Sequence, residues 1–295
     1  MRSDVAIDDS AASAPEARKP GGRREILLRV VMAAVLAPLG LWVCWVGGLP
    51  LILATGACAV MASFEWTRMA SQTKAKWAQF VLFVVMAVTA AGAVWIAPQG
   101  IERVALVALA GCAVATLVVW LGKGSISSMA FGAIYTSLPF GSFVWIREDV
   151  PDGQMVLMSL LAIVWATDIA AYFAGRGFGG PLLSPKDSPN KTWTGAIGAL
   201  VCAALAGGAV ARAAGGDFMH WVFASSVLSI VAQAGDLLES RFKRLYGVKD
   251  TSGIIPGHGG VLDRLDALMA AAVFAALTLR FLPMLAPGFG SAGAG

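Results

Sequence analysis

A stretch near the end of the sequence, residues 233–266, spaces its acidic residues in a way that suits metal and phosphate chemistry. Asp236 and Ser240 are four residues apart, so a helix places them on one face. Asp263 and Asp266 follow at a spacing of three, where another apolar segment begins. Hard carboxylate oxygens suit Mg²⁺, which takes one or two of them and leaves its other positions to water and phosphate. The stretch therefore predicts a magnesium site that receives a phosphate-bearing substrate.

Basic residues lie between these carboxylates. The residues of this part that could contact phosphate or transfer a proton are Lys243, Arg244, Lys249, Asp250, His258 and Arg264. Cations beside a metal site neutralise the charge of a transferring phosphoryl group. A loop that only sets membrane orientation would also carry Lys and Arg, but it has no use for Asp236 inside an apolar segment or for the Gly-His-Gly-Gly run at 257–260. Acid and base together predict phosphate chemistry.

A second polar stretch, residues 175–195, follows an apolar segment that contains Asp168. Its glycines let the backbone approach a phosphate, and Lys191 and Thr192 add a cation and a hydroxyl at the start of the next helix, where the helix dipole is positive. This combination suits a triphosphate. Two plainer interpretations stay open: a flexible basic connection, and an Asp168 that pairs with a cation of a neighbouring helix to pack the membrane interior.

The elements that position these residues are too apolar for an ordinary soluble domain. Charged residues make up 14% of the 295 residues, against about 25% in typical soluble domains. Nine apolar segments follow one another, at 26–46, 49–65, 78–97, 103–122, 128–146, 154–175, 193–212, 219–239 and 262–284. Several approach or exceed the roughly 18 residues of a membrane-spanning helix. The expected fold is an all-α polytopic membrane protein with about nine transmembrane helices.

The distribution of basic residues predicts the orientation. With a cytoplasmic N-terminus and nine spans, 18 of the 22 Lys and Arg residues fall on the cytoplasmic side. Both long polar loops, 176–192 and 240–261, then face the cytoplasm, where nucleotides are available. The predicted organisation is a disordered cytoplasmic tail at 1–25, N-terminal transmembrane helices at 26–150, a catalytic transmembrane region at 151–285 and a flexible tail at 286–295.

The run from Ser240 to Asp266 resembles the signature of the phosphatidate cytidylyltransferase (CDP-diacylglycerol synthase) family. The matching positions are Ser240, Lys243-Arg244, Lys249-Asp250, Pro256, His258-Gly259-Gly260 and Asp263-Arg264-Leu265-Asp266. Upstream, the resemblance includes Gly235-Asp236-Leu237, Ser188 to Trp193 and Asp168 to Tyr172. It covers roughly 160–285, whereas the N-terminal half agrees only in being hydrophobic. Thr194 departs from the pattern, because many members carry Glu or Gln there.

The resemblance implies that CTP and phosphatidic acid react to give CDP-diacylglycerol and pyrophosphate for phospholipid biosynthesis, in a bacterial inner membrane. Asp236 and Asp263 would hold Mg²⁺ so that a phosphatidate oxygen attacks the α-phosphorus in line. The implied catalytic residues are these two with Lys243, Arg244, Lys249 and His258. The implied substrate contacts are Asp168, Ser188, Lys191, Thr192, Ser240, Asp250, Gly259, Gly260 and Arg264. A second cation and a homodimer stay open, and no nucleic-acid partner is expected.

Two other classes of function also stay open. A CTP-dependent lipid kinase would use the same nucleotide, metal and membrane, but it would leave free CDP instead of releasing pyrophosphate. A membrane transporter would also bury Asp168 and Asp236, yet the sequence has no convincing internal repeat of the kind that transporters often show.

Overall fold

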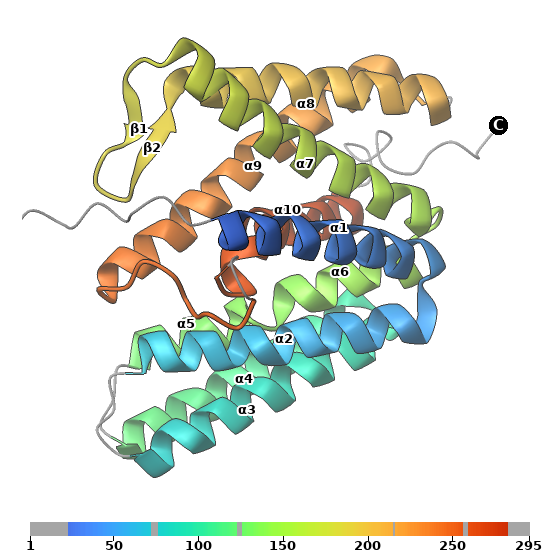
Figure 1. Ribbon diagram of the computed structural model, residues 1–295. Coiled ribbons are helices and arrows are strands. Elements are labelled where there is room, and N and C mark those ends of the chain that lie inside the picture. Colours follow the sequence, from blue (N-terminus) through green and yellow to red (C-terminus); the bar gives the residue numbers. More distant parts are fainter. Residues whose placement is uncertain (1–22, 72–75, 123–125, 215, 256–258, 283–295) are drawn as a thin grey trace, which may run out of the picture.

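The computed structural model describes residues 23–71, 76–122, 126–214, 216–255 and 259–282, and it is a bundle of helices with one small β-hairpin (Figure 1). In chain order the elements are α1 (Arg23–Val46), α2 (Gly48–Ala70), α3 (Lys76–Ile96), a 3₁₀ turn (Ala97–Gln99), α4 (Ile101–Gly122), α5 (Ile126–Tyr135), α6 (Leu138–Glu148), α7 (Gly153–Phe178), β1 (Leu182–Ser184), β2 (Ser188–Thr192), α8 (Trp193–Ala214), α9 (Phe218–Leu245) and α10 (Leu262–Phe281). Of the predicted tails at 1–25 and 286–295, residues 1–22 and 286–295 lie outside the described ranges, whereas residues 23–25 belong to α1.

The helices form two groups that are joined through α6 and α10. The helices α2, α3, α4 and α5 pack together on one side, and α7, α8 and α9 pack together on the other (Figure 1). The helix α10 packs against both α9 and α6, and α6 packs against α3. The start of α10 therefore lies between a helix of the N-terminal half and a helix of the C-terminal half.

Within the described residues, seven helical segments are long and apolar enough to cross a membrane. They are 48–70, 76–99, 101–122, 127–148, 153–178, 193–214 and 218–245. A helix of 22 residues is about 33 Å long, which matches the hydrocarbon core of a bilayer. The chain is therefore a multi-pass membrane protein. Each of the nine predicted apolar segments contains a helix in its described part. The helices α1 and α10 are not among the seven segments that are long and apolar enough to cross a membrane, so the count of nine stays a prediction.

The fifth predicted segment is broken in the structure. The helix α5 ends at Tyr135 and α6 begins at Leu138, because Pro139 in the first turn of α6 has no N–H to continue the helix. The hydroxyls of Thr136 and Ser137 donate to backbone carbonyls of the preceding turn, at 2.9 and 2.5 Å. This break leaves the aromatic end of α5 packed against the buried Trp66 of α2 and Phe242 of α9.

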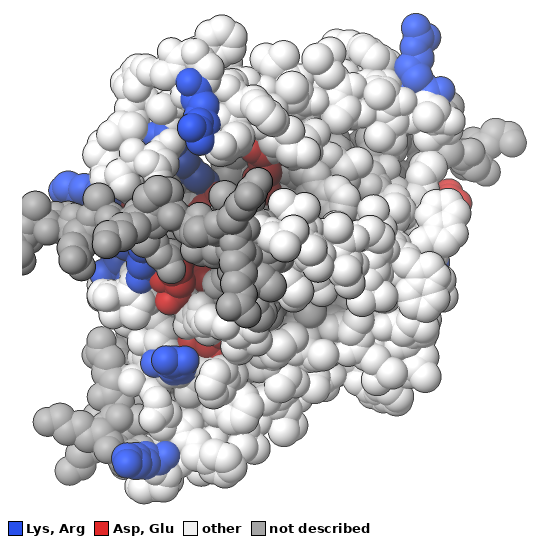
Figure 2. All heavy atoms as spheres, in the orientation of Figure 1, with Lys and Arg blue, Asp and Glu red and all other residues white. Residues whose placement is uncertain are grey.

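The predicted glycine-rich loop after α7 contains a β-hairpin. The strands β1 and β2 are antiparallel, with Leu182 opposite Thr192 and Ser184 opposite Ser188. At the turn, the Ser184 hydroxyl donates to Asp187 Oδ2 at 2.9 Å. The hairpin directs β2 toward α9. On the face shown in Figure 2, the charged side chains gather mainly on the hairpin's side of the view, and most of the rest of that face is uncharged.

Candidate active site

The two polar stretches predicted to carry chemistry meet in the structure. Lys191 of β2 forms an ion pair with Asp236 of α9, with 2.5 Å between Nζ and Oδ2. Both side chains remain partly accessible, at 27% and 29%. Asp168 of α7 is close enough for its charge to interact with both of them. The hairpin, α7 and α9 therefore contribute to one accessible cluster, as expected from the sequence.

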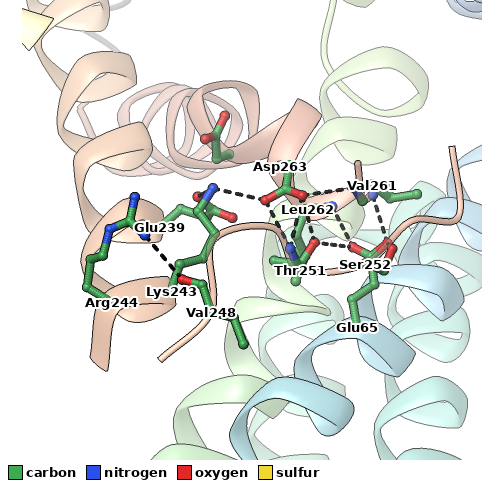
Figure 3. Close-up of polar contacts among 12 residues, drawn as sticks. Glu65, Glu239, Lys243, Arg244, Val248, Thr251, Ser252, Val261, Leu262 and Asp263 are labelled. Carbon is green, nitrogen blue, oxygen red and sulfur yellow. Dashed lines mark hydrogen bonds and ion pairs between the residues drawn. The ribbon is translucent and has the colours of Figure 1, made fainter. Parts of the chain in front are cut away.

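A second ion pair lies deeper, at the end of α9 (Figure 3). Lys243 Nζ lies 2.6 Å from Glu239 Oε2 and 2.9 Å from Asp263 Oδ1. The spacing of four residues on α9 brings Glu239 and Lys243 together, and the first turn of α10 supplies Asp263. The three side chains are 3 to 13% exposed. Glu239 is thus a member of the site that the prediction did not include.

Asp263 accepts several further hydrogen bonds. Its Oδ2 accepts from the N–H of Gly260 at 2.8 Å, the N–H of Thr251 at 3.0 Å and the hydroxyl of Thr251 at 3.1 Å. Burial favours the neutral acid, but the hydrogen bond from Gly260 and the contact with Lys243 outweigh it, so the pKa of Asp263 is lowered. Asp263 is therefore an ionised carboxylate that holds the loop before α10.

The two ion pairs belong to one electrostatic cluster. Asp266 interacts with Asp236, Lys191 and Lys243. Glu239 interacts with Asp266 and with Asp263. In the described part of the chain, this acidic cluster brings together five carboxylates, from Asp168, Asp236, Glu239, Asp263 and Asp266, and two ammonium groups, from Lys191 and Lys243. The excess of acid favours the binding of a further cation.

The donor set fits a hard divalent cation. The buried carboxylates of Glu239 and Asp263 lie side by side and both contact Lys243, so hard oxygen donors are concentrated at this point. Across the described ranges, no group of three His, Cys, Asp or Glu side chains is arranged as a ready metal site. Mg²⁺ requires only one or two protein carboxylates, because substrate phosphate and water complete its coordination. Asp236 and Asp263 stay the predicted ligands.

The glycines of the signature are packed against carboxylates. Gly259 has a φ of +88°, and a Cβ there would lie 2.9 Å from Asp263 Oδ2. A Cβ on Gly260 would lie 2.6 and 2.7 Å from the two carboxylate oxygens of Glu65, a residue of α2. Both glycines were predicted to contact substrate. The structure gives them a second role: because they have no side chain, the carboxylates of Asp263 and Glu65 can pack directly against the backbone of the loop.

Sequence reasoning missed Glu65. Its side chain is fully buried and accepts four hydrogen bonds from the segment 251–262 (Figure 3). The available signal was a carboxylate at the end of the apolar segment 49–65, which is the same signal that drew attention to Asp168 and Asp236. The N-terminal half thus contributes a polar residue to the site.

Other predicted residues lie around the cluster in supporting positions. The Thr192 hydroxyl accepts from the N–H of Gly195 at 3.1 Å, which caps α8, and it is 2.9 Å from the Thr194 hydroxyl. Thr194 in turn donates to the carbonyl of Gly179, so it closes the base of the hairpin. Arg244 reaches the carbonyl of Asp187 at 3.4 Å and thereby links α9 to the hairpin turn.

The remaining predicted contacts differ in exposure. Lys249, Asp250 and Arg264 are exposed, whereas Ser188 and Ser240 are partly buried, and His258 lies outside the described residues. Lys249 and Asp250 lie in the loop between α9 and α10, and Arg264 lies in the first turn of α10. Their roles toward substrate stay predictions.

Known proteins resemble this chain over most of its length. The sequence model of the Cytidylyltransferase family matches residues 27–282. The chain belongs to the cytidylyltransferase family. A phosphatidate cytidylyltransferase of Brucella suis is 41% identical over 247 residues, which cover 83% of this chain and 89% of that protein. Proteins of the same name from Pseudomonas aeruginosa and Haemophilus influenzae are 33% and 32% identical, over 84% and 83% of this chain and 95% and 93% of theirs.

The match to the cytidylyltransferase family includes the N-terminal half, whose resemblance to the family was expected to be limited to its hydrophobic character. It therefore covers α2 together with α9 and α10. The contact between Glu65 and the loop before α10 lies entirely inside the region shared with the family.

Proposed function

We propose that this protein transfers the cytidylyl group of CTP to phosphatidic acid, giving CDP-diacylglycerol and pyrophosphate, and thereby serves phospholipid biosynthesis. Its relatives of that name share the sequence over most of the chain. The observation that carries the proposal is the ion pair between Lys191 and Asp236, because it joins the hairpin to the acidic end of α9 in one accessible site. A site with clustered carboxylates and ammonium groups suits a metal-bound triphosphate.

The chain's own residues act by binding and by electrostatics. Asp236 and Asp263 would hold Mg²⁺, which neutralises triphosphate charge when it is bound. Lys191 and Lys243, which now pair with these carboxylates at 2.5 and 2.9 Å, supply ammonium groups for phosphate oxygens and for the leaving pyrophosphate. A phosphatidate oxygen forms one bond to the α-phosphorus as the bond to the bridging oxygen of the β-phosphate breaks. Phosphatidate is already ionised near neutral pH, so no general base is needed.

Two labelled nucleotides distinguish this function from the alternatives. With purified protein, Mg²⁺ and phosphatidate, label from [α-³²P]CTP should enter lipid and pyrophosphate should be released, each only when all three components are present. A CTP-dependent lipid kinase would instead move label from [γ-³²P]CTP into lipid and leave CDP free. A transporter would move neither label into lipid. Asp236→Asn, which keeps the volume of the side chain but removes its charge, is the matched inactive control.

We also propose nine transmembrane helices in the bacterial inner membrane, with the N-terminus and the acidic cluster on the cytoplasmic side. The 18-to-4 distribution of basic residues supports this orientation. In a variant without the four native cysteines, single cysteines near Lys186 and Lys249 should be labelled from the cytoplasmic side, and those near Asp152 and Gly290 from the opposite side. Labelling of the first two positions from different sides would end the model of one shared site. A homodimer and a second cation stay predictions.

A further inference from the structure

Glu65 connects the N-terminal helices to the loop that carries the signature. It lies on α2 and has no exposed surface. Its carboxylate accepts hydrogen bonds from the hydroxyls of Thr251 and Ser252, at 3.1 and 2.6 Å, and from the N–H groups of Val261 and Leu262, both at 2.9 Å. Figure 3 shows these donors converging on Glu65 from one side. The contacts span 186 to 197 residues of sequence.

Two of these donors are backbone N–H groups at the start of α10, which have no acceptor within the helix itself. The first N–H groups of a helix have no partner within the helix. Val261, the N-terminal capping position of α10, provides no side-chain cap of its own. Glu65 provides the cap from another helix, and its negative charge suits the positive end of the helix dipole. The same first turn of α10 carries Asp263, so this cap also holds Asp263 in its position beside Lys243 of α9.

Thr251 ties the two carboxylates to each other. Its hydroxyl lies 3.1 Å from Glu65 Oε2 and 3.1 Å from Asp263 Oδ2. A hydroxyl has only one proton to donate, so one carboxylate receives it at a time. The N–H of Thr251 adds a contact to Asp263 at 3.0 Å. A continuous series of polar contacts thus runs from Glu65 through Thr251 and Asp263 to Lys243 on α9.

A carboxylate with no exposure inside a membrane-spanning helix is expensive unless hydrogen bonds satisfy it. Ser252, Val261 and Leu262 donate to Glu65, and the Thr251 hydroxyl is shared between Glu65 and Asp263, so the carboxylate is satisfied by residues that lie close to Asp263 in sequence or in space. We propose that Glu65 is a positioning residue for cytidylyl transfer: its carboxylate holds Thr251, Ser252 and the start of α10, and through them Asp263, in the geometry that the reaction requires. This inference rests on the proposed function.

A pair of matched substitutions tests it. Glu65→Gln keeps the volume of the side chain but removes its negative charge and replaces one acceptor oxygen by an NH₂ group. Glu148→Gln is the control, because Glu148 Oε1 caps α2 in the same way, accepting from the N–H of Gly48 at 2.7 Å, but it lies at the other end of α2. Displacement of a reacting group by 1 Å can lower a rate about 100-fold. We therefore expect kcat to fall about 100-fold in Glu65→Gln, with the KM for CTP changed far less, and to remain near wild type in Glu148→Gln.

Hydrogen exchange supplies a readout that does not depend on activity. The amides of Val261 and Leu262 donate to Glu65, so they should exchange faster in Glu65→Gln and at the wild-type rate in Glu148→Gln. Unchanged exchange at these amides, or a kcat within twofold of wild type, would overturn the proposal. If the wild-type protein transfers no cytidylyl group, the proposed function fails, while the exchange experiment still decides whether Glu65 holds the loop.

A second pair of variants applies if Glu65→Gln does not fold. Thr251→Val removes the hydroxyl between the carboxylates but keeps the N–H bond to Asp263, whereas Thr251→Ser keeps both. We expect Thr251→Val to lower kcat at least tenfold and Thr251→Ser to restore most of it. Equal kcat values for the two variants would show that the hydroxyl has no positioning role and would overturn the proposal.

Discussion

Replacement of Gly260 by alanine should lower both stability and activity, because the added methyl group has no space beside Thr251 and Glu65. A Cβ at this position would lie 2.0 Å from Thr251 Oγ1 and 2.6 and 2.7 Å from the carboxylate oxygens of Glu65. Nonbonded contacts of carbon are comfortable at about 3.5 Å, so the Glu65 oxygens must move by about 1 Å and the Thr251 hydroxyl by about 1.5 Å. Gly260 is not among the described residues with positive φ, so the effect comes from the added methyl group rather than from backbone strain.

The magnitude follows from two costs. Overpacking of a buried position costs about 1–3 kcal/mol, and each hydrogen bond lost from a charged group costs about 1.5–3 kcal/mol. The shift in Tm is about 2–4 °C per kcal/mol for 150–250 residues and becomes smaller for longer chains, so a total of about 3 kcal/mol should lower Tm by about 5 °C. Because Asp263 accepts from the N–H of Gly260 at 2.8 Å, the same movement displaces Asp263 and should lower kcat about 100-fold.

Gly253→Ala is the matched control. Gly253 lies in the same loop, its φ is not positive, and a Cβ there meets nothing within 4 Å. Thermal melts of the purified variants in detergent and the pyrophosphate-release assay should show a large loss for Gly260→Ala and near wild-type values for Gly253→Ala. Similar Tm and kcat values for the two variants would refute the claim that Gly260 is required to admit Glu65.

The other predictions concern the acidic cluster and its neighbours. Asp236→Asn should abolish turnover with little change in Tm, since Asp236 is partly exposed. Asp263→Asn should abolish turnover and also lower Tm by several degrees, since Asp263 is buried and holds the loop. Parallel thermal melts and activity assays check this, and near-normal turnover of either variant at limiting Mg²⁺ would remove that residue from the metal site. Lys191→Ala should raise the KM for CTP more than that for phosphatidate, and Arg244→Ala the reverse, in steady-state kinetics with each substrate varied in turn. Equal effects would show one undivided phosphate site. Tyr135→Phe should leave Tm unchanged or slightly raised in thermal melts, because the buried Tyr135 hydroxyl has no hydrogen-bond partner among the described residues; a clear fall in Tm would contradict this.

The apolar pattern predicted where the helices lie, but not where all of them end. Helices lie in the described parts of all nine apolar segments, with a break at 136–137 in the fifth, since long hydrophobic runs have few alternatives in a membrane. The polar loop predicted from residue 240 is helical up to Leu245, because Glu239 and Lys243 pair at a spacing of four and the charged turn extends α9 beyond its apolar part. The polar stretch after α7 forms a hairpin, which hydrophobic periodicity does not detect in so short and polar a segment.

The sequence also predicted which residues would cluster, but not how they are connected. Asp236 and Lys191 form an ion pair although 45 residues separate them. The predicted topology put both residues on one side of the membrane but did not pair them. Glu65 and Glu239 carried weaker signals, a carboxylate at the end of an apolar segment and a spacing of four from Lys243. Their contacts with the loop before α10 and with Asp263 join distant segments, and such contacts leave no spacing pattern in one sequence.

The cap that α2 provides to α10 has a consequence for biosynthesis. A chain grows at about 5–20 residues per second, so the 186 residues between Glu65 and Thr251 take about 10–40 s to make. During that time the helix that contains Glu65 has entered the membrane, but the donors of the carboxylate do not yet exist. A lone acidic residue raises the free energy of an inserted helix by up to a few kcal/mol. Assembly of the site therefore waits for the end of the chain, and a ribosome that stops before residue 251 leaves a protein with an unsatisfied charge in its second helix.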